Sequence, residues 1–202
     1  MPHQKRYQAV LMFGGPGTGK GTQGVVLGQF SNLVHMAMGD IFRALDKQSA
    51  IGQEFLSYAT QGLLVPDELT VQVWQGFVDH QIATGKLDPN YHTLILDGIP
   101  RTLRQVELLS ERLDLLKVVH LAMSDRSALI ARLKGRALEA DRPDDADEQV
   151  IRKRLEVYDE ETRPVLESFD RSLIAEINAD QPPLAVLRDI AAVLVDCVPA
   201  AI

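Results

Sequence analysis

The chain has 202 residues, of which 46% are hydrophobic and 24% are charged, proportions that are typical of a folded globular domain and exclude a disordered chain. The 21 Lys and Arg against 28 Asp and Glu give a formal net charge of −7. Proteins that bind nucleic acid usually carry a basic excess, so we expect no nucleic-acid partner. The single cysteine, Cys197, cannot form a disulfide within the chain, and residues 1–13 contain neither a secretion signal nor a membrane span. We therefore expect a cytoplasmic protein without a membrane partner.

Short apolar runs alternate along the chain with longer segments of helical period. This alternation predicts an α/β fold of three layers, in which helices flank both faces of a parallel sheet. Five strands are predicted, at 9–13, 33–36, 94–96, 118–123 and 173–177. Helices are predicted to start at Pro66 and to cover 128–138 and about 147–169. Because no linker or repeat divides the chain, we expect one domain over 1–202.

A glycine-rich segment, GGPGTGKGTQ at 14–23, lies between the first predicted strand and a helical sequence. In such a turn the backbone N–H groups face inward and form a cradle for phosphates, while the lysine reaches the terminal phosphates of a nucleotide. The segment therefore predicts a P-loop domain. The residues of this loop that we expect to bind a nucleoside triphosphate are Gly15, Pro16, Gly17, Thr18, Gly19, Lys20, Gly21 and Thr22.

The loop also departs from the general P-loop pattern. Gly21 occupies the position where the pattern has Ser or Thr, and Thr22 follows one residue later, so direct metal ligation by the loop is in doubt. A dinucleotide-binding fingerprint can instead be laid on Gly19, Gly21 and Gly24, with Asp40 as the ribose-binding acid. We disfavour this alternative because its first glycine comes several residues after the strand ends.

Two aspartates follow predicted strands. Asp97 comes directly after the third strand and Asp40 a few residues after the second. The carboxyl ends of parallel strands meet at one edge of a sheet, which is also where the glycine-rich loop lies. A carboxylate at this edge can hold Mg²⁺ through water. We therefore predict Asp97 as the residue that holds Mg²⁺ through water, with Asp40 as a second candidate for the same role.

Several further motifs occur along the chain. They are the loop at 14–23, GDIFR at 39–43, LVPDEL at 64–69, DGIPR at 97–101 with Gln105, then Arg132, Arg136, RPDD at 142–145, and Arg154. In this order and nearly this spacing they resemble the adenylate kinase family of nucleoside monophosphate kinases, over almost the whole chain. The resemblance implies a monomer that reversibly transfers a phosphoryl group from MgATP to AMP and gives two ADP.

The resemblance also implies residue roles. Two nucleotides that meet phosphate to phosphate bring several negative charges together, and arginine suits them because its planar, permanently charged fork binds phosphate with two hydrogen bonds. The implied catalytic residues are Lys20, Arg101, Arg136, Arg142 and Arg154. Arg132, Arg136 and Gln181 are implied to bind ATP together with the loop, Arg132 by stacking on the base and Gln181 by its backbone carbonyl. The implied AMP-binding residues are Met38, Gly39, Arg43, Val65, Gly98, Arg101, Gln105, Arg142 and Arg154.

Two mobile pieces are implied by the same resemblance. One is an acceptor-binding segment at about 37–65, and the other is a short lid at about 133–141. The lid contains no cysteine, so we expect Mg²⁺ and no zinc. Asp144 and Asp145 are expected to pair with lid arginines.

The choice of acceptor depends on two positions. Gln105 matches the family's adenine-binding residue, and its amide offers a donor and an acceptor to adenine, although a flipped amide would suit another base. Met38 stands where these kinases typically have threonine and their pyrimidine-specific relatives alanine, and its polarisable side chain could pack against a base. We predict AMP, with a UMP/CMP kinase or a broad-specificity kinase as the alternative.

Other classes of function fit the sequence less well. A P-loop hydrolase or switch that reads guanine commonly carries an Asn-Lys-x-Asp element, and the sequence contains no such tetrapeptide. A related protein that has lost turnover would be expected to lack the loop lysine or one of the arginines, and all of them are present.

Overall fold

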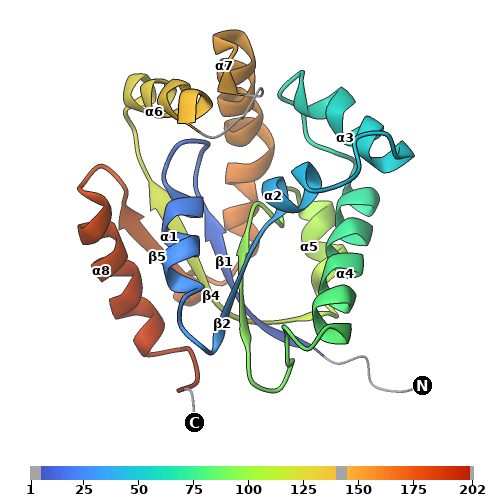
Figure 1. Cartoon of the computed structure of the whole chain (residues 1–202). Helices are drawn as coiled ribbons and strands as arrows, with labels where there is room; N and C mark the ends of the chain where they lie inside the picture. Colours follow the sequence, from blue (N-terminus) through green and yellow to red (C-terminus); the bar gives the residue numbers. More distant parts are fainter. Residues whose placement is uncertain (1–5, 140–144, 201–202) are drawn as a thin grey trace.

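The structure is a computed structural model that describes residues 6–139 and 145–200, and it has three layers, with a parallel sheet between helices (Figure 1). The strands follow the order β2-β3-β1-β4-β5. They are β1 (Tyr7–Phe13), β2 (Leu33–Ala37), β3 (Thr93–Asp97), β4 (Leu113–Ala122) and β5 (Ile174–Asn178). The five predicted strands are confirmed, although β4 begins five residues earlier than its apolar run.

The helices connect these strands. They are α1 (Lys20–Leu27), α2 (Met38–Arg43), α3 (Ala50–Ala59), α4 (Asp67–Ala83), α5 (Leu103–Leu109), α6 (Arg126–Glu139), α7 (Glu148–Val157) and α8 (Pro183–Val195). Pro66 precedes α4 as its N-cap, and Asp67 and Glu68 lie in the first turn, where carboxylates favour the positive end of the helix dipole. The predicted start of this helix is confirmed.

Each face of the sheet has its own core, because successive strand side chains point to opposite faces. One core joins alternate residues of β1 and β3, such as Leu11 and Leu96, to Trp74 of α4 and to Leu109 of α5. The other joins the intervening residues to α1 and α8, and it contains Met12, Ile95, Val119, Leu27 and Ile190. The strands are therefore buried on both sides, which explains why they appear in the sequence as continuous apolar runs.

The helix predicted at about 147–169 is confirmed as a continuous helical stretch, but only its first part, up to Val157, is an α-helix. From there the chain forms a π-helical turn, Tyr158–Thr162, and then a 3-10 helix, Arg163–Ser168. Pro164 explains the change, because proline has no N–H to donate and its ring crowds the carbonyl four residues earlier. The path of the chain remains helical, and what changes is the spacing of its hydrogen bonds.

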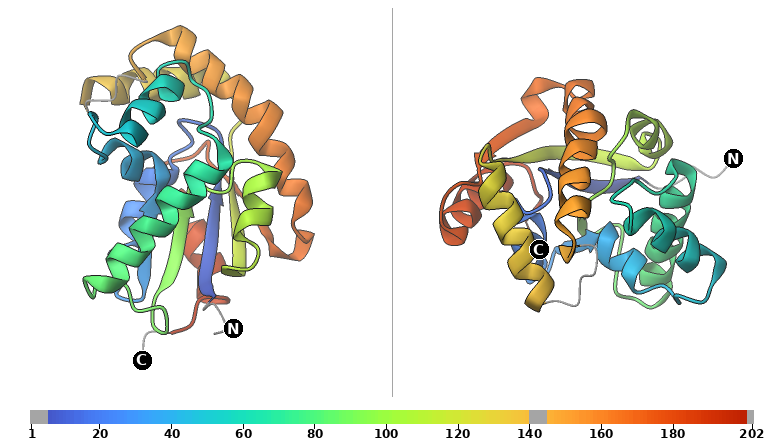
Figure 2. Two further views of the ribbon diagram at one scale, coloured as in Figure 1. Left: turned by 90° about the vertical axis from the view of Figure 1, so that its right-hand side faces the viewer. Right: turned by 90° about the horizontal axis from the view of Figure 1, so that it is seen from above.

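Four helices lie beyond the carboxyl ends of the strands. In Figure 1 these are α2, α3, α6 and α7, at the top of the view, where the connection from β1 to α1 also lies, and Figure 2 shows them from above. A small third core joins α6 to α7 through Leu129, Leu133, Ile151 and Leu155. Of the helices in the two described stretches, none is long and apolar enough to cross a membrane. Arg142, Asp144 and the end of the predicted lid lie outside the described residues.

Candidate functional site

The glycine-rich loop joins β1 to α1 at the carboxyl edge of the sheet. Gly19 is the N-cap of α1 and has φ 97°, a backbone conformation that side-chain-bearing residues rarely adopt. The buried Thr18 hydroxyl donates a hydrogen bond to the carbonyl oxygen of Gly15 at 2.9 Å. Because this hydroxyl is used inside the loop, Thr18 braces the loop backbone.

Lys20 is the first residue of α1, and its ammonium lies in the loop. Nζ donates hydrogen bonds to the carbonyl oxygens of Gly14 at 2.6 Å and of Gly15 at 3.2 Å. Burial of the ammonium lowers the pKa of Lys20 from 10.5 to about 8; the charge of Asp97 opposes this shift, and the charges of three arginines, Arg101, Arg136 and Arg154, add to it. These four basic residues, Lys20, Arg101, Arg136 and Arg154, are called the cation cluster below.

The lowered pKa of Lys20 makes a prediction about stability. Between pH 8 and 10.5 the unfolded chain binds a proton at Lys20 that the folded chain has released, so the free energy of unfolding should rise with pH in this window. Below pH 8 the buried charge destabilises the fold. The full shift corresponds to about 3 kcal/mol, and we expect about 1–2 kcal/mol because part of Lys20 remains exposed.

Lys20→Met removes this titration. The variant should therefore be more stable than the wild type at pH 7, and the difference in unfolding free energy should shrink as the pH rises to 10.5. Urea denaturation across this range measures the effect. A difference that stays constant or grows with pH would contradict the assigned burial of the ammonium.

Asp97 ends β3 beside the loop. Gly21, in the first turn of α1, faces this carboxylate: a Cβ atom built on Gly21 would stand 3.7 Å from Asp97 Oδ2. Burial alone would raise the pKa of Asp97, but the nearby His35 ring and the charges of Lys20 and Arg101 outweigh burial and lower it. An ionised oxygen donor beside a phosphate cradle fits Mg²⁺, which takes few protein ligands and keeps water and phosphate as the others.

Asp40, the second candidate for the metal, has a different environment. Its carboxylate accepts a hydrogen bond from Arg43 Nη2 at 2.5 Å, and its side chain is 56% exposed. A Cβ atom on Gly39 would stand 2.9 Å from the same Nη2, so the Arg43 guanidinium folds back over this glycine. Asp40 is therefore paired with Arg43, an arginine that is itself expected to bind phosphate.

Arg101 shows the same arrangement after β3. Its Nε donates to the carbonyl oxygen of Gly98 at 3.0 Å, and a Cβ atom on Gly98, which has φ 83°, would stand 2.9 Å from Arg101 Nη2. A residue other than glycine at position 98 would be strained by its φ and would collide with the guanidinium. Gly98 therefore permits the observed position of Arg101.

Gln105 is 2% exposed and holds two neighbours. Its Oε1 accepts the backbone N–H of Arg101 at 2.7 Å, and its Nε2 donates to Asp67 Oδ1 at 2.9 Å. Asp67 Oδ1 also accepts from the hydroxyl of Thr102, the N-cap of α5. An amide has two donors and two acceptor lone pairs, so one of each remains for a base.

Asp145 binds two members of the cation cluster. Its side chain is 0% exposed, and Oδ2 accepts a hydrogen bond from Arg136 Nε at 2.6 Å and lies 2.5 Å from Nη2 of the same guanidinium in an ion pair. Oδ1 accepts from Arg154 Nη1. The expected pairing of Asp145 with a lid arginine is confirmed, and it extends to α7.

Two of the residues predicted to bind ATP, Arg132 and Gln181, lie near the turn that follows β5. Arg132 Nη1 lies 3.4 Å from the carbonyl oxygen of Ala179, at the turn that follows β5, so Arg132 and the segment that contains Gln181 do come together. The Gln181 side chain donates to Asp189 of α8 at 2.7 Å.

Met38 is 2% exposed within the core shared with α4, and Val65 packs against that core. That Met38 contacts the acceptor base stays a prediction.

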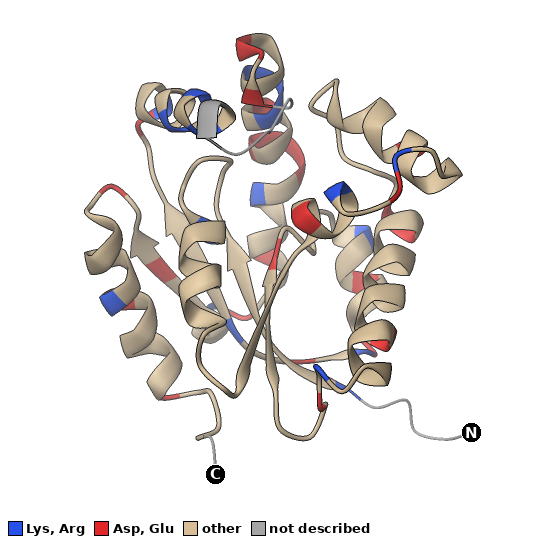
Figure 3. Cartoon of the chain, in the orientation of Figure 1, with Lys and Arg blue, Asp and Glu red and all other residues tan. Residues whose placement is uncertain are grey.

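Thr22 is exposed on α1, and Pro16, Gly17 and Gly21 are half-buried along the loop. Figure 3 shows Lys and Arg on α2, α6 and α7, the helices beyond the carboxyl ends of the strands. The net negative charge of the chain is therefore compatible with a basic region at this edge.

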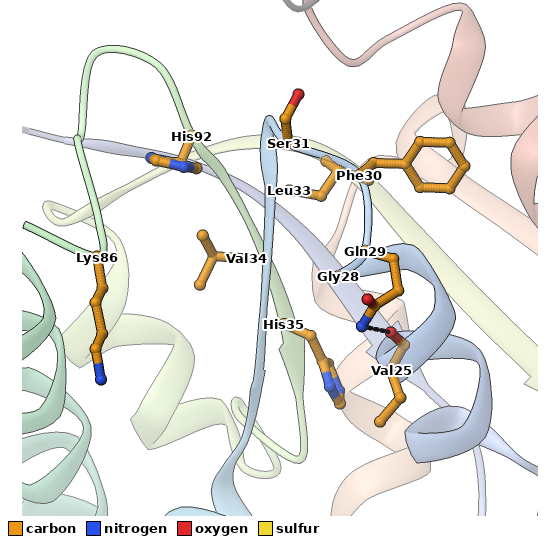
Figure 4. Close-up of a pocket in the computed structure, with 10 residues that line it drawn as sticks. All are labelled: Val25, Gly28, Gln29, Phe30, Ser31, Leu33, Val34, His35, Lys86 and His92. Atoms are coloured by element: carbon orange, nitrogen blue, oxygen red, sulfur yellow. Dashed lines mark hydrogen bonds between the residues drawn. The ribbon is translucent and has the colours of Figure 1, made fainter.

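A pocket of about 470 Å³ lies elsewhere, between α1 and the edge strand β2 (Figure 4). In the close-up, His35 lies near Gln29 and Val25, while Lys86 and His92 come from the connection between α4 and β3. Within the described residues its lining includes none of the predicted nucleotide-binding positions. We assign the pocket no role in phosphate chemistry.

Two contacts of the site were missed by the sequence analysis. His35 Nε2 lies 3.9 Å from Asp97 Oδ2, which is too long for a hydrogen bond but close enough to act on its charge. The second contact is that of Asp67, whose carboxylate connects Gln105 to Thr102. The LVPDEL motif marked Asp67 as part of the site, but nothing in it identified the partners.

Comparison with known proteins bears on this site as a whole. A family model described as adenylate kinase matches residues 12–174. The adenylate kinase of Mycoplasma pneumoniae is 36% identical over 201 residues, covering 86% of this chain and 91% of that protein. That of Kocuria rhizophila is 39% identical, covering 84% and 89%, and that of a Cyanothece species is 38% identical, covering 90% and 92%.

These matches span the glycine-rich loop, the segment after β3 and the helices that carry the arginines. The alternative of a dinucleotide fingerprint at Gly19, Gly21 and Gly24 is not supported, since Lys20 directs its ammonium into the loop. By its sequence relatives and its five-stranded parallel fold, the chain belongs to the adenylate kinase family of ATP:AMP phosphotransferases.

Proposed function

We propose that this chain transfers the γ-phosphoryl group of ATP to AMP at the cation cluster. The observation that carries the proposal is the position of the Lys20 ammonium inside the glycine-rich loop, where the charges of Arg101, Arg136 and Arg154 act on its pKa. Asp145 and Asp97 offset part of the repulsion among these four cations, and a bound polyanion would offset more of it. A chain of phosphates is the anion that such a site suits best, because each arginine can bind it with two hydrogen bonds.

The residues have distinct roles in this proposal. The loop backbone and Lys20 bind the donor phosphates, and Arg132 stacks on the donor base near the carbonyl of the turn at 179–182. Arg43 and Arg101 hold the acceptor phosphate, with Gln105 beside its base. Arg136 and Arg154, together with Arg142, which lies outside the described residues, neutralise the group in transit.

The transfer needs no general base. An oxygen of the AMP phosphate is already anionic, so it forms a bond to the γ-phosphorus while the bond to the bridging β-oxygen breaks. The work of the protein is to place the two oxygens in line and to stabilise the charge that shifts between them. Asp97 would hold Mg²⁺ through water, and the bound ion would neutralise part of the phosphate charge.

We also propose that two segments move during the cycle. These are the acceptor-binding segment at about 37–65 and the lid at about 133–141. In support, Gly52 is the only residue of α3 that is buried, and such weakly packed elements open at low cost. Closure would exclude water, which competes with AMP for the phosphoryl group.

The preferred acceptor is a separate prediction. With MgATP as donor, we expect kcat/KM for AMP to exceed that for UMP and for CMP by about tenfold or more, because Gln105 keeps one donor and one acceptor that fit adenine. A coupled assay for ADP formation, with each monophosphate in turn, makes the measurement. Faster transfer to UMP or CMP would overturn the choice of AMP, and no AMP-dependent turnover despite ATP binding would overturn the proposed function.

We also propose, from the family resemblance, that the protein acts as a monomer. We also propose that the protein works in a reducing compartment such as the cytoplasm. In support, its one cysteine, Cys197, cannot form a disulfide within the chain, and such disulfides are typical of proteins in oxidising compartments. Sedimentation of the purified protein with and without nucleotides tests the first point.

A further inference from the structure

Three polar side chains form a connected row beside the glycine-rich loop. The hydroxyl of Tyr158 lies 3.3 Å from His120 Nε2, and His120 Nδ1 lies 3.3 Å from a carboxylate oxygen of Glu176. Tyr158 begins the π-helical turn after α7, His120 is on β4 and Glu176 on β5. The proposed function gives none of these residues a role.

The row lies at the level of the sheet where the loop begins. Phe13, the last residue of β1, is in register with His120, and His120 is in register with Glu176. Tyr158 lies against the loop, because a Cβ atom built on Gly15 would stand 3.5 Å from its Cδ1. Its ring therefore contacts the residue whose carbonyl oxygen accepts hydrogen bonds from Thr18 and Lys20.

The partners determine the direction of each hydrogen bond. An ionised carboxylate only accepts, so His120 Nδ1–H donates to Glu176 and the neutral ring presents Nε2 as an acceptor for the hydroxyl of Tyr158. Burial lowers the pKa of His120, Glu176 opposes this shift, and Arg163 and Lys20 add to it. Burial also raises the pKa of Tyr158 to about 12. Both shifts favour a neutral ring and a protonated hydroxyl near pH 7.

We propose that Tyr158 is a positioning residue for the glycine-rich loop, and that His120, oriented by Glu176, holds the Tyr158 ring against Gly15. The inference rests on the proposed function, since it concerns the binding of the donor phosphates by that loop. A π-helical turn often occurs at a functional site, and here the turn directs the tyrosine toward the loop. The same segment follows α7, which carries Arg154, so the row links the loop to a member of the cation cluster.

The test removes only the hydroxyl. Tyr158→Phe keeps the ring on Gly15 but cannot donate to His120, and we expect its Kd for MgATP, measured by calorimetry without AMP, to rise about three- to tenfold, the effect of one lost hydrogen bond. The Kd for AMP should change less than about twofold, because the hydroxyl acts on the loop that binds the donor phosphates and Tyr158 is not among the residues assigned to AMP. A general loss of structure would instead weaken both.

Variants at His120 test the connection. His120→Leu should weaken MgATP binding as much as Tyr158→Phe does, and the double variant should be no worse than either single one. His120→Gln should bind MgATP within about twofold of the wild type, because its amide can accept from the hydroxyl. Tyr91→Phe is the matched control: it removes a hydroxyl that bonds to Ser31, far from the loop, and both Kd values should stay unchanged.

The outcomes separate this inference from the proposed function. An unchanged Kd for MgATP in Tyr158→Phe, or equal weakening of MgATP and AMP, would overturn the positioning role even if the wild type turns over. If the wild type forms no ADP but the row variants weaken MgATP binding as expected, the proposed function fails while the positioning role stands.

Discussion

Replacing Lys20 by methionine is expected to lower kcat for ADP formation by about 10²- to 10³-fold, the loss seen when one preorganised charge donor is removed from a transition state. The ammonium already lies inside the loop, where Nζ donates to two backbone carbonyl oxygens. The positive charge is therefore in place before the phosphates bind. Methionine has a similar length and no charge. The measurement is steady-state ADP formation at saturating MgATP and AMP.

Lys86→Met is the matched control for this experiment. It makes the same chemical change on the exposed connection between α4 and β3, beside the pocket of Figure 4, and should leave kcat within about twofold. Thermal unfolding confirms that both variants are folded. A rate for Lys20→Met close to that of the wild type would refute the role assigned to Lys20.

Replacing Asp145 by alanine is expected to destabilise the fold by about 3 kcal/mol and to reduce kcat/KM for both substrates. Removing one partner of a buried ion pair is strongly destabilising, and the guanidinium groups of Arg136 and Arg154 share the buried carboxylate of Asp145. Without it Arg136 and Arg154 would repel each other and adopt other positions. Urea denaturation gives the stability, and the coupled assay gives the rates.

Glu148→Ala is the matched control for Asp145→Ala. Glu148 also joins two cations on α6 and α7, Lys134 and Arg152, but its side chain is 39% exposed, against 0% for Asp145. Exposed ion pairs contribute little, so we expect nearly unchanged stability and rates. Similar losses in the two variants would mean that burial of Asp145 is not what matters.

The strands and the loop could be predicted because their signals are local. A strand buried on both faces appears as a continuous apolar run, and the glycines around Lys20 mark a turn that few other residues could form. The helix predicted at about 147–169 has nearly the predicted extent, but its change from α to π and 3-10 geometry was not predicted. The signal for that change is also local, since Pro164 lies inside the helix.

Other parts of the site could not be predicted because they depend on how distant segments pack. Met38 belongs to a motif of the acceptor side, but only the tertiary structure determines that its side chain enters the core. Gln105 matched an adenine-binding position, whereas its bonds to Arg101 and Asp67 follow from the packing of α5 on α4. His120 and Tyr158 are 38 residues apart, and no spacing rule brings them together.

The members of the cation cluster come from α1, from the segment after β3, from α6 and from α7, so no short stretch of chain can assemble the cluster by itself. Nucleotides should therefore bind the folded chain and scarcely bind the unfolded one. By mass action, a ligand at 100 times its Kd then adds about 2.7 kcal/mol to the free energy of unfolding. In a cell the substrates of this protein would thus protect it from unfolding, and its lifetime would depend on the nucleotide supply.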